Sequence, residues 1–407
     1  MRFILMLVIS GKLLIPMDLS QTNHLKAYGI AYHALARGEK VEWLLNYRDG
    51  SFLLESSNGS EKECLLAGVR VVEIDIGKEA AIRATIEESN MNAVLLEKAP
   101  KVAVYAPPTA DPWDDAVRLA LEYAEIPYDV LWDPQVLAGK LANYDWVHLH
   151  HEDFTGQYGK FYYNYHNADW YKEQVRLNEQ TAKKLGFDGV PKLKLAVAKV
   201  IKRYVLEGGF LFAMCSATDT YDIALAAEAT DVVHQIFDGT PMEKDCQEKL
   251  DYSRTFAFEG FTLVMDPYRY EHSDIDVSEG AVARGPDAVF ALFDFSAKFD
   301  PVPCMLVQDH TALCKEFLGQ NTGFNRKFLK RDVLILGEVK GTEEVKYIHG
   351  NRGEGTFTFL GGHDPEDYAH RIGDPPTDLE IYRNSPGYRL ILNNVLFPAA
   401  ERKPLKT

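Results

Sequence analysis

The chain has 407 residues and a formal net charge of −16, from 60 acidic and 44 basic residues. Hydrophobic residues make up 46% and charged residues 26%, which is typical of a folded protein with a sizeable core. Because phosphate backbones and anionic lipid surfaces attract basic faces, this charge argues against a nucleic-acid or membrane-surface partner. The five cysteines are widely spaced and form no CxxC pair, which argues against a zinc ribbon and a dithiol redox motif.

The first ten residues, MRFILMLVIS, have two interpretations. A basic residue followed by an apolar run has the composition of a short export signal, and the same run suits a first buried strand. The sequence therefore leaves the compartment open between the cytoplasm and the periplasm. No other apolar run approaches the 18 residues of a membrane span.

Residues 1–98 predict a small N-terminal α/β lobe. A strand over 13–16, a helix over 24–36 and a strand over 40–45 give it a βαβ-like start. Residues 46–62 have the composition of a loop, and a strand over 69–76 and a helix over 80–88 follow. The KAP triplet at 98–100 marks the junction to a second domain, residues 99–407.

In the second domain, predicted strands and helices alternate. The strands are expected over 101–105, 128–132, 146–150, 210–214, 333–336, 345–349 and 356–360, and the helices over 114–124, 172–206, 223–228 and 388–396. Residues 240–330 predict an irregular insertion with short strands. The alternation predicts a mostly parallel sheet covered on both faces, with its functional residues at the carboxyl ends of strands.

Two strand ends carry the parts of a cysteine nucleophile system. Cys215 follows an apolar strand and precedes a helix, which is the arrangement of the nucleophile turn of hydrolases. His363 follows another strand through two glycines, and Asp364, Glu366 and Asp367 compete to orient its ring as the base. The alternatives are a buried structural cysteine and a loop of helix-capping residues.

A third strand end has the sequence HLHHED, residues 148–153. Strand alternation places His148, His150 and Glu152 on one face, and with His363 these residues suit zinc or iron. We favour the other interpretation, in which His150, His151 and Glu152 contact a substrate and the protein holds no metal or cofactor.

An aromatic segment follows directly. Seven of the fourteen residues 158–171, beginning with Tyr158, are aromatic, against 12% over the whole chain. Aromatic faces beside amides suit a sugar or peptide, although a loop anchored by its own aromatics has the same composition. We also expect Asp364 and Arg48 at the substrate, the latter through a carboxylate or phosphate. The predicted partner is a small molecule, sugar or peptide; the oligomeric state stays open.

The segments GGFLFAMCSAT, LGGHDPED and SPGYRLILNNVLFP resemble the class I glutamine amidotransferase-like family, which has a flavodoxin-like parallel sheet. The resemblance implies Cys215 as the nucleophile, His363 as the base and Glu366 as the orienting acid. Over nearly its full length, through segments such as HLHHEDFTGQYGKF and GGHDPEDYAHR, the chain also resembles a bacterial family automatically named "asparagine synthetase B".

Asparagine synthetases of the glutamine-dependent type begin with a cysteine after Met1 and carry an SGGxDS-type loop for ATP. This chain has Arg2 and neither that loop nor a Walker-type loop, which argues against ATP-dependent asparagine synthesis. The sequence therefore predicts thiol-dependent hydrolysis of an amide or related acyl bond. A non-catalytic sugar- or peptide-binding protein is the alternative, and a metal-dependent hydrolase is the third hypothesis.

Overall fold

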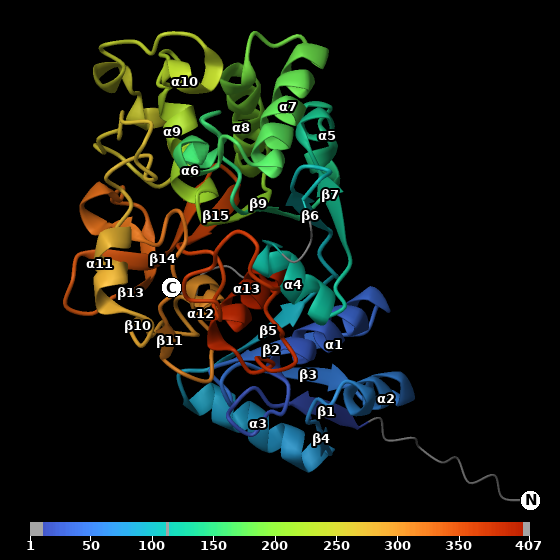
Figure 1. The fold of residues 1–407 in the computed structure, drawn as a ribbon. Helices are drawn as coiled ribbons and strands as arrows, with labels where there is room; N and C mark the ends of the chain where they lie inside the picture. Colours follow the sequence, from blue (N-terminus) through green and yellow to red (C-terminus); the bar gives the residue numbers. More distant parts are fainter. Residues whose placement is uncertain (1–10, 111–113, 402–407) are drawn as a thin grey trace, which may run out of the picture.

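The structure is a computed structural model that describes residues 11–110 and 114–401. It contains two β-sheets with helices packed against them (Figure 1). The interpretations of the first ten residues lie outside the described residues. Within the described ranges, no helix combines the length and the apolar character needed to cross a membrane.

The N-terminal sheet has the strand order β4-β1-β3-β2-β5, and every neighbouring pair is antiparallel. The strands are β1 (Lys12–Ile15), β2 (Val41–Leu45), β3 (Ser51–Glu55), β4 (Val72–Ile74) and β5 (Asn92–Leu96). The predicted βαβ-like start is present as β1, α1 and β2, but its two parallel strands do not pair, because β3 lies between them and is antiparallel to both. β3 lies within the stretch over 46–62 that the sequence predicted as a loop. The strand was missed because the polar residues of a hairpin turn precede the short apolar run of β3.

Three helices cover this sheet: α1 (His24–Ala36), α2 (Asn58–Leu66) and α3 (Ile76–Glu88). The helix predicted over 24–36 is confirmed as α1, whose first turn is capped by the side chain of Asn23. α1 also packs against the C-terminal helix α13 (Pro386–Leu396), where the Tyr28 hydroxyl donates a hydrogen bond to Asn393. The two sheets thus share one hydrophobic core through α1 and α13.

The second sheet is mixed. Its parallel half has the order β7-β6-β8-β9-β15, with β6 (Val102–Tyr105), β7 (Tyr128–Leu131), β8 (Trp146–Leu149), β9 (Phe210–Met214) and β15 (Gly355–Leu360). Counted along the chain these strands run 2-1-3-4-5, an order found in doubly wound sheets. The prediction of a mostly parallel sheet holds for this half only.

The other half of the sheet is antiparallel and continues β15 through β14 (Glu344–Arg352), β13 (Leu334–Glu338), β10 (Val289–Leu292) and β11 (Leu313–Lys315). β12 (Phe324–Asn325) pairs with β14. The insertion over 240–330 supplies β10, β11 and β12 together with the short helices α11 (Ser278–Arg284) and α12 (Pro301–Leu306). The sequence predicted an irregular insertion with short strands for these residues.

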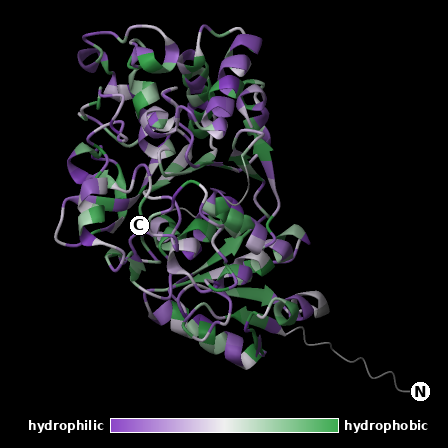
Figure 2. Ribbon diagram, in the orientation of Figure 1, coloured by the Kyte–Doolittle hydropathy of each residue, from purple (hydrophilic) through white to green (hydrophobic). Residues whose placement is uncertain are grey.

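Helices cover both faces of the parallel half. α4 (Ala116–Tyr123) and α13 lie on one face; α5 (Asp133–Leu137), α7 (Asp169–Lys184), α8 (Val190–Leu206) and α9 (Ala217–Ala226) form the other layer, with the short helices α6 (Tyr162–Tyr165) and α10 (Gln235–Asp238) nearby. Alternate strand residues enter two cores: Val102 and Val104 face α4, whereas Ala103 and Tyr105 face α8. In Figure 2 the strands are largely hydrophobic, while α7 is largely hydrophilic.

Candidate functional site

Three neighbouring parallel strands, β8, β9 and β15, end at the same edge of the sheet. Leu149 pairs with Ala213, and Leu360 pairs with Met214, so the chain positions that follow the strands lie side by side. This register brings the backbones of His150, Cys215 and His363 together: the Ala217 N–H donates to the His150 carbonyl, and the Cys215 N–H to the Gly362 carbonyl at 3.1 Å.

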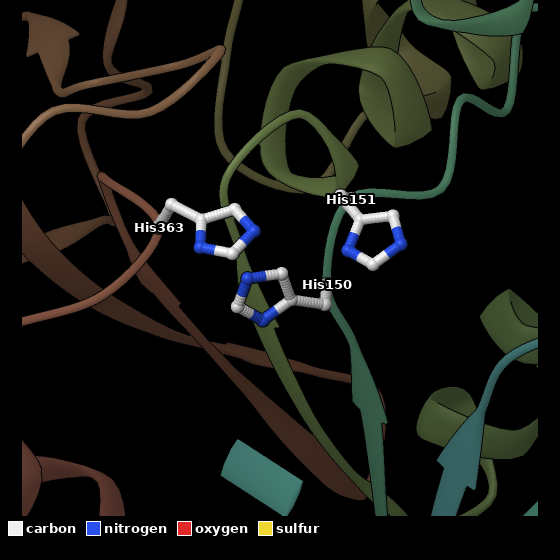
Figure 3. Close-up of side chains that lie close together, drawn as sticks. All are labelled: His150, His151 and His363. Carbon is white, nitrogen blue, oxygen red and sulfur yellow. The ribbon is translucent and has the colours of Figure 1, made fainter. Parts of the chain in front are cut away.

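His150, His151 and His363 form a compact cluster at this edge (Figure 3). One ring nitrogen from each lies within 4.8 Å of the other two. His150 Nε2, His151 Nδ1 and His363 Nδ1 are buried, and none has a hydrogen-bond partner among the described residues. A buried polar atom normally finds a partner, so three unpaired nitrogens in one place point to a shared ligand.

Carboxylates lie behind two of these rings. Asp115, whose side chain caps the start of α4, has an oxygen 3.4 Å from His150 Nδ1 and 3.4 Å from His148 Nε2. Asp114 has an oxygen 3.8 Å from His151 Nε2. Each carboxylate therefore engages one ring nitrogen and leaves the opposite nitrogen free, as carboxylates do behind metal-bound histidines.

The sequence prediction missed these two carboxylates because Asp114 and Asp115 have the ordinary composition of a helix start. The metal site considered from the sequence also included His148 where the cluster has His151. Strand alternation fails beyond Leu149, where β8 ends, so His150 and His151 both reach the cluster. His148 lies beside His150, with its Nε2 3.3 Å from His150 Nδ1, while its own Nδ1 is 3.1 Å from the Phe212 carbonyl.

The electrostatics of the cluster favour neutral rings at His150 and His363 but not at His151. Burial lowers the pKa of His150, and burial together with the neighbouring histidines holds the pKa of His363 well below its ordinary value. For His151, burial opposes the effect of nearby Asp114 and Glu152, and its pKa is raised. Burial likewise raises the pKa of Glu152, which is 8% exposed. Neutral imidazole is the form that binds metals.

His370 borders the cluster. Its ring stacks on that of His363 with centroids 4.1 Å apart. Both of its nitrogens face carboxylates, at 3.2 Å from Asp114 and 3.0 Å from Asp367, which raise its pKa to about 8. His370 therefore supports the cluster from outside rather than offering a free nitrogen.

Cys215 occupies the turn between β9 and α9 with a positive φ of 50°, a left-handed conformation that is costly for a residue with a Cβ. Its sulfur accepts a hydrogen bond from the Gln320 N–H at 3.2 Å. Burial raises the pKa of the Cys215 thiol to about 11, although the backbone N–H groups of Gln320, Ser216 and Asn321 oppose that rise.

The predicted catalytic set is only partly assembled. In the described part of the chain, no hydrogen bond joins the Cys215 sulfur to His363, whose Nδ1 is unpaired. Glu366 does not orient His363, because its carboxylate turns toward Ser385 and lies 3.9 Å from Lys315 Nζ. Proline at position 365 and the turn that follows direct it away from the histidines.

The remaining predicted substrate residues lie elsewhere. Arg48 pairs with Asp18 at 2.6 Å within the N-terminal lobe. Asp364 accepts hydrogen bonds from the Tyr388 and Thr377 hydroxyls, both at 2.8 Å, which fixes it in the core beside α13. Tyr158 is 5% exposed and lies among other aromatic rings of its segment. None of these three contributes a side-chain contact to the histidine cluster among the described residues.

Comparison with known proteins places the chain only coarsely. No protein-family model matches it, and no curated relative does. Among solved structures, the cytoplasmic proteins STM3548 and STM1381 of Salmonella typhimurium are similar at 11% and 12% identity, each with a TM-score of 0.37 over 74% of this chain and 100% of theirs. Gan42B, a GH42 beta-galactosidase, is similar at 10% identity and a TM-score of 0.24, over 66% of this chain and 28% of that one. Likenesses at this level carry no inference about the site.

Proposed function

We propose that the protein is a metal-dependent hydrolase whose metal is held by His150, His151 and His363. Two observations carry this proposal: one ring nitrogen from each histidine lies within 4.8 Å of the other two, and each ring has a buried nitrogen without a hydrogen-bond partner among the described residues. Leaving one such atom unpaired costs about 1–3 kcal/mol, so three together are a substantial cost that a shared ion removes.

The donor set indicates both the kind of metal and its role. Three imidazoles suit zinc and other late first-row divalent ions, and three protein ligands are typical of catalytic sites, which keep a position open for water or substrate. An ion held there would supply Lewis-acid activation of water near neutral pH.

The chain's own residues supply the other parts of the proposed site. Asp115 and Asp114 fix the orientation of His150 and His151. Glu152 follows the two histidines, and its raised pKa brings the carboxyl closer to the range useful for moving a proton. We assign it the role of general base. The substrate class, an amide or related acyl bond in a small molecule, sugar or peptide, rests on the amidotransferase-like resemblance and on the aromatic segment 158–171.

Thiol-dependent hydrolysis is the second candidate, and the conformation of Cys215 favours it. A cysteine at positive φ between a strand and a helix has the geometry of a hydrolase nucleophile turn. The backbone N–H groups around its sulfur also suit stabilisation of negative charge on an acyl oxygen. The two candidates compete for His363, which serves either as a metal ligand or as the base for the thiol.

Metal analysis combined with a hydrolysis assay separates the candidates. We expect about one divalent transition-metal ion per chain in protein expressed with zinc, and hydrolysis of p-nitrophenyl esters or p-nitroanilides that a chelator abolishes and zinc restores. Cys215→Ala should retain both properties. A metal-free protein whose activity disappears in Cys215→Ala would establish the thiol candidate instead. A protein with neither property that binds sugars or peptides would be non-catalytic.

A further inference from the structure

A second group of unpaired polar atoms belongs to the turn and the loops next to Cys215. Ser216 Oγ, Asp219 Oδ1, Asp276 Oδ2 and both amide atoms of Asn321 are buried without a hydrogen-bond partner in the described part of the chain. Asp219 is 2% exposed, and Ser216 and Asn321 are fully buried. Five unpaired atoms in one locality require an explanation, because buried polar groups are rarely left without partners.

These atoms belong to one cluster, which we call the aspartate cluster: Ser216, Asp219, Asp276 and Asn321. Ser216 and Asp219 lie in the first turn of α9. Burial and the charge of Asp276 raise the pKa of the Asp219 carboxyl well above its ordinary value, and the side chain of Asn321 opposes that rise. Asp276 is tied to the same loop, because its Oδ1 accepts the Thr322 N–H at 3.3 Å.

The nearest buried cations do not pair with these carboxylates. Lys160 Nζ donates to the carbonyls of Val264, at 2.7 Å, and Glu271, at 2.9 Å. Lys346 Nζ donates to the carbonyls of Phe317 and Thr322. Lys160 interacts with Asp219 and Lys346 with Asp276 only through their charges, without an ion pair within 4.0 Å among the described residues.

The unpaired atoms determine which ligand would satisfy them. Asp219 Oδ1, Asp276 Oδ2 and Asn321 Oδ1 are acceptors, Asn321 Nδ2 is a donor, and the Ser216 hydroxyl can act as either. Acceptors thus outnumber donors, and two of them belong to carboxyl groups. A group that carries several N–H donors and a positive charge matches this set, whereas an anion or a carbonyl oxygen does not.

An aromatic surface adjoins the cluster. Tyr270 is joined to the loop that contacts Cys215, because Gln320 Nε2 donates a hydrogen bond to the Tyr270 carbonyl at 3.3 Å, and this residue is 41% exposed. Its ring lies 5.7 Å from that of Phe161, and the exposed pair Tyr163 and Tyr268 lies nearby in sequence with ring centroids 5.5 Å apart. Aromatic rings favour both the apolar body and the charge of an organic cation.

We propose that the aspartate cluster binds the ammonium group of a small organic amine, whose apolar body contacts Tyr270. This site goes beyond the proposed hydrolysis, and its occupancy does not depend on metal at the histidines. The cluster lies beside Cys215, because Ser216 follows Cys215 in the turn that begins α9 and the Gln320 N–H donates to the Cys215 sulfur. The bound amine would therefore lie next to the nucleophile turn.

Calorimetric titration with benzylammonium tests the proposal, with benzyl alcohol as the neutral counterpart and with sodium chloride holding the ionic strength constant. At pH 8 we expect benzylammonium to bind and benzyl alcohol not to bind. Asp219→Asn and Asp276→Asn should each weaken binding by tenfold or more, about 1.4 kcal/mol or more, whereas the exposed-residue control Asp287→Asn should bind like the parent.

Thermal unfolding of each variant shows whether it is folded, and two aspartate variants keep the test valid if one does not fold. The proposal is overturned if the parent does not bind benzylammonium, if benzyl alcohol binds equally well, or if both aspartate variants bind unchanged. A crystal structure that shows only water between Asp219, Asp276 and Asn321 at saturating benzylammonium would also overturn it.

Discussion

Two groups of residues at the end of β9 differ in what their buried atoms lack. In the first, His150, His151 and His363 from the ends of the flanking strands β8 and β15 offer free nitrogens, and carboxylates lie near His150 and His151. In the second, the Cys215 sulfur receives backbone hydrogen bonds, and its thiol pKa is raised to about 11 by burial. The histidine cluster offers free nitrogens to a metal ion, whereas the Cys215 thiol is held in its neutral form.

This difference shows that strand ends of similar appearance in a sequence can carry unequal chemistry. A thiol becomes a strong nucleophile when nearby cations or a base lower its pKa, and the groups around Cys215 do not achieve this. Imidazoles become metal ligands when they are neutral, close together and oriented. The three histidines lie close together, and burial lowers the pKa of His150 and His363, which favours their neutral forms. The comparison therefore favours metal chemistry over thiol chemistry.

The largest expected effect tests the histidine side directly. His363→Ala removes one of three ligands, so we expect metal content to fall from about one ion per chain to nearly none and the chelator-sensitive hydrolysis to disappear. His166→Ala, which removes an exposed histidine of the aromatic segment, should change neither quantity. Mass-spectrometric metal analysis of the dialysed proteins measures the difference, and full metal content in His363→Ala would contradict the assigned ligand set.

A smaller effect is expected from the carboxylate behind the cluster. Asp115→Asn keeps the helix cap of α4 but weakens the hold on His150, and we expect metal affinity to fall by about 10–100-fold. Competition with a chromogenic chelator measures this change. Asp75→Asn is the matched control, because Asp75 caps α3 in the same way and is remote from the histidines. Equal affinity in both variants would leave Asp115 without a role at the metal.

The sequence predicted most elements of the fold because their patterns are local. The helix over 24–36 and the strand over 210–214 agree with α1 and β9, since capping residues and apolar runs define both segments. The pairing of strands depends on contacts between distant segments, and so the antiparallel N-terminal sheet was not predicted. The same limit applies to the parallel sheet, which is continued by antiparallel strands from the insertion.

The candidate site was predicted in part for the same reason. Strand-end reasoning identified His150, His151, Cys215 and His363, because parallel strands carry their functional residues at one edge. It assigned Glu366 to His363 from proximity along the chain, although the carboxylates that face the histidines come from residues 114 and 115, before α4. That contact spans a large sequence separation and has no local signature.

The histidine cluster and the Cys215 turn both depend on the backbone at Gly362. A substitution at Gly362 therefore tests both through the stability of the protein. Gly362 has a φ of 97°, its carbonyl accepts the Cys215 N–H, and an added Cβ would overlap the Phe317 ring. We expect Gly362→Ala to lower the free energy of unfolding by about 1–3 kcal/mol and to weaken metal binding as His363 shifts. Urea unfolding measures the first effect and chelator competition the second.

Gly373→Ala separates backbone strain from packing. Gly373 has a similar φ of 92°, but nothing lies within 4 Å of where its Cβ would be. The free energy of unfolding of this variant should therefore fall only by the smaller amount that backbone strain causes. Its metal affinity should equal that of the parent. Equal losses of stability and affinity in the two variants would show that the contact with Phe317 is unimportant for the site.

The smallest expected effect concerns Lys346, which holds the loop over 317–322 on the thiol side through the carbonyls of Phe317 and Thr322. Burial lowers the pKa of Lys346 from 10.5 to about 7. Between these two values the unfolded chain binds a proton that the folded protein does not, so the unfolding free energy gains a positive slope with pH. Below pH 7 both states are protonated, and the slope from this group disappears.

Replacing Lys346 by Met, which has a similar length and no charge, should remove this contribution. Urea unfolding at pH 7.5 and pH 8.5 should show a smaller rise in stability for Lys346→Met than for the parent, by up to about 1.4 kcal/mol per pH unit. Exposed Lys315 provides the control, since Lys315→Met should keep the parent slope. If the parent and Lys346→Met have the same slope, Lys346 remains charged in the folded protein near pH 8. The loop whose Gln320 N–H donates to Cys215 would then be held by an ammonium ion, and its positive charge would also favour the Cys215 thiolate. The difference in reactivity between the Cys215 thiol and the histidine cluster would then be smaller.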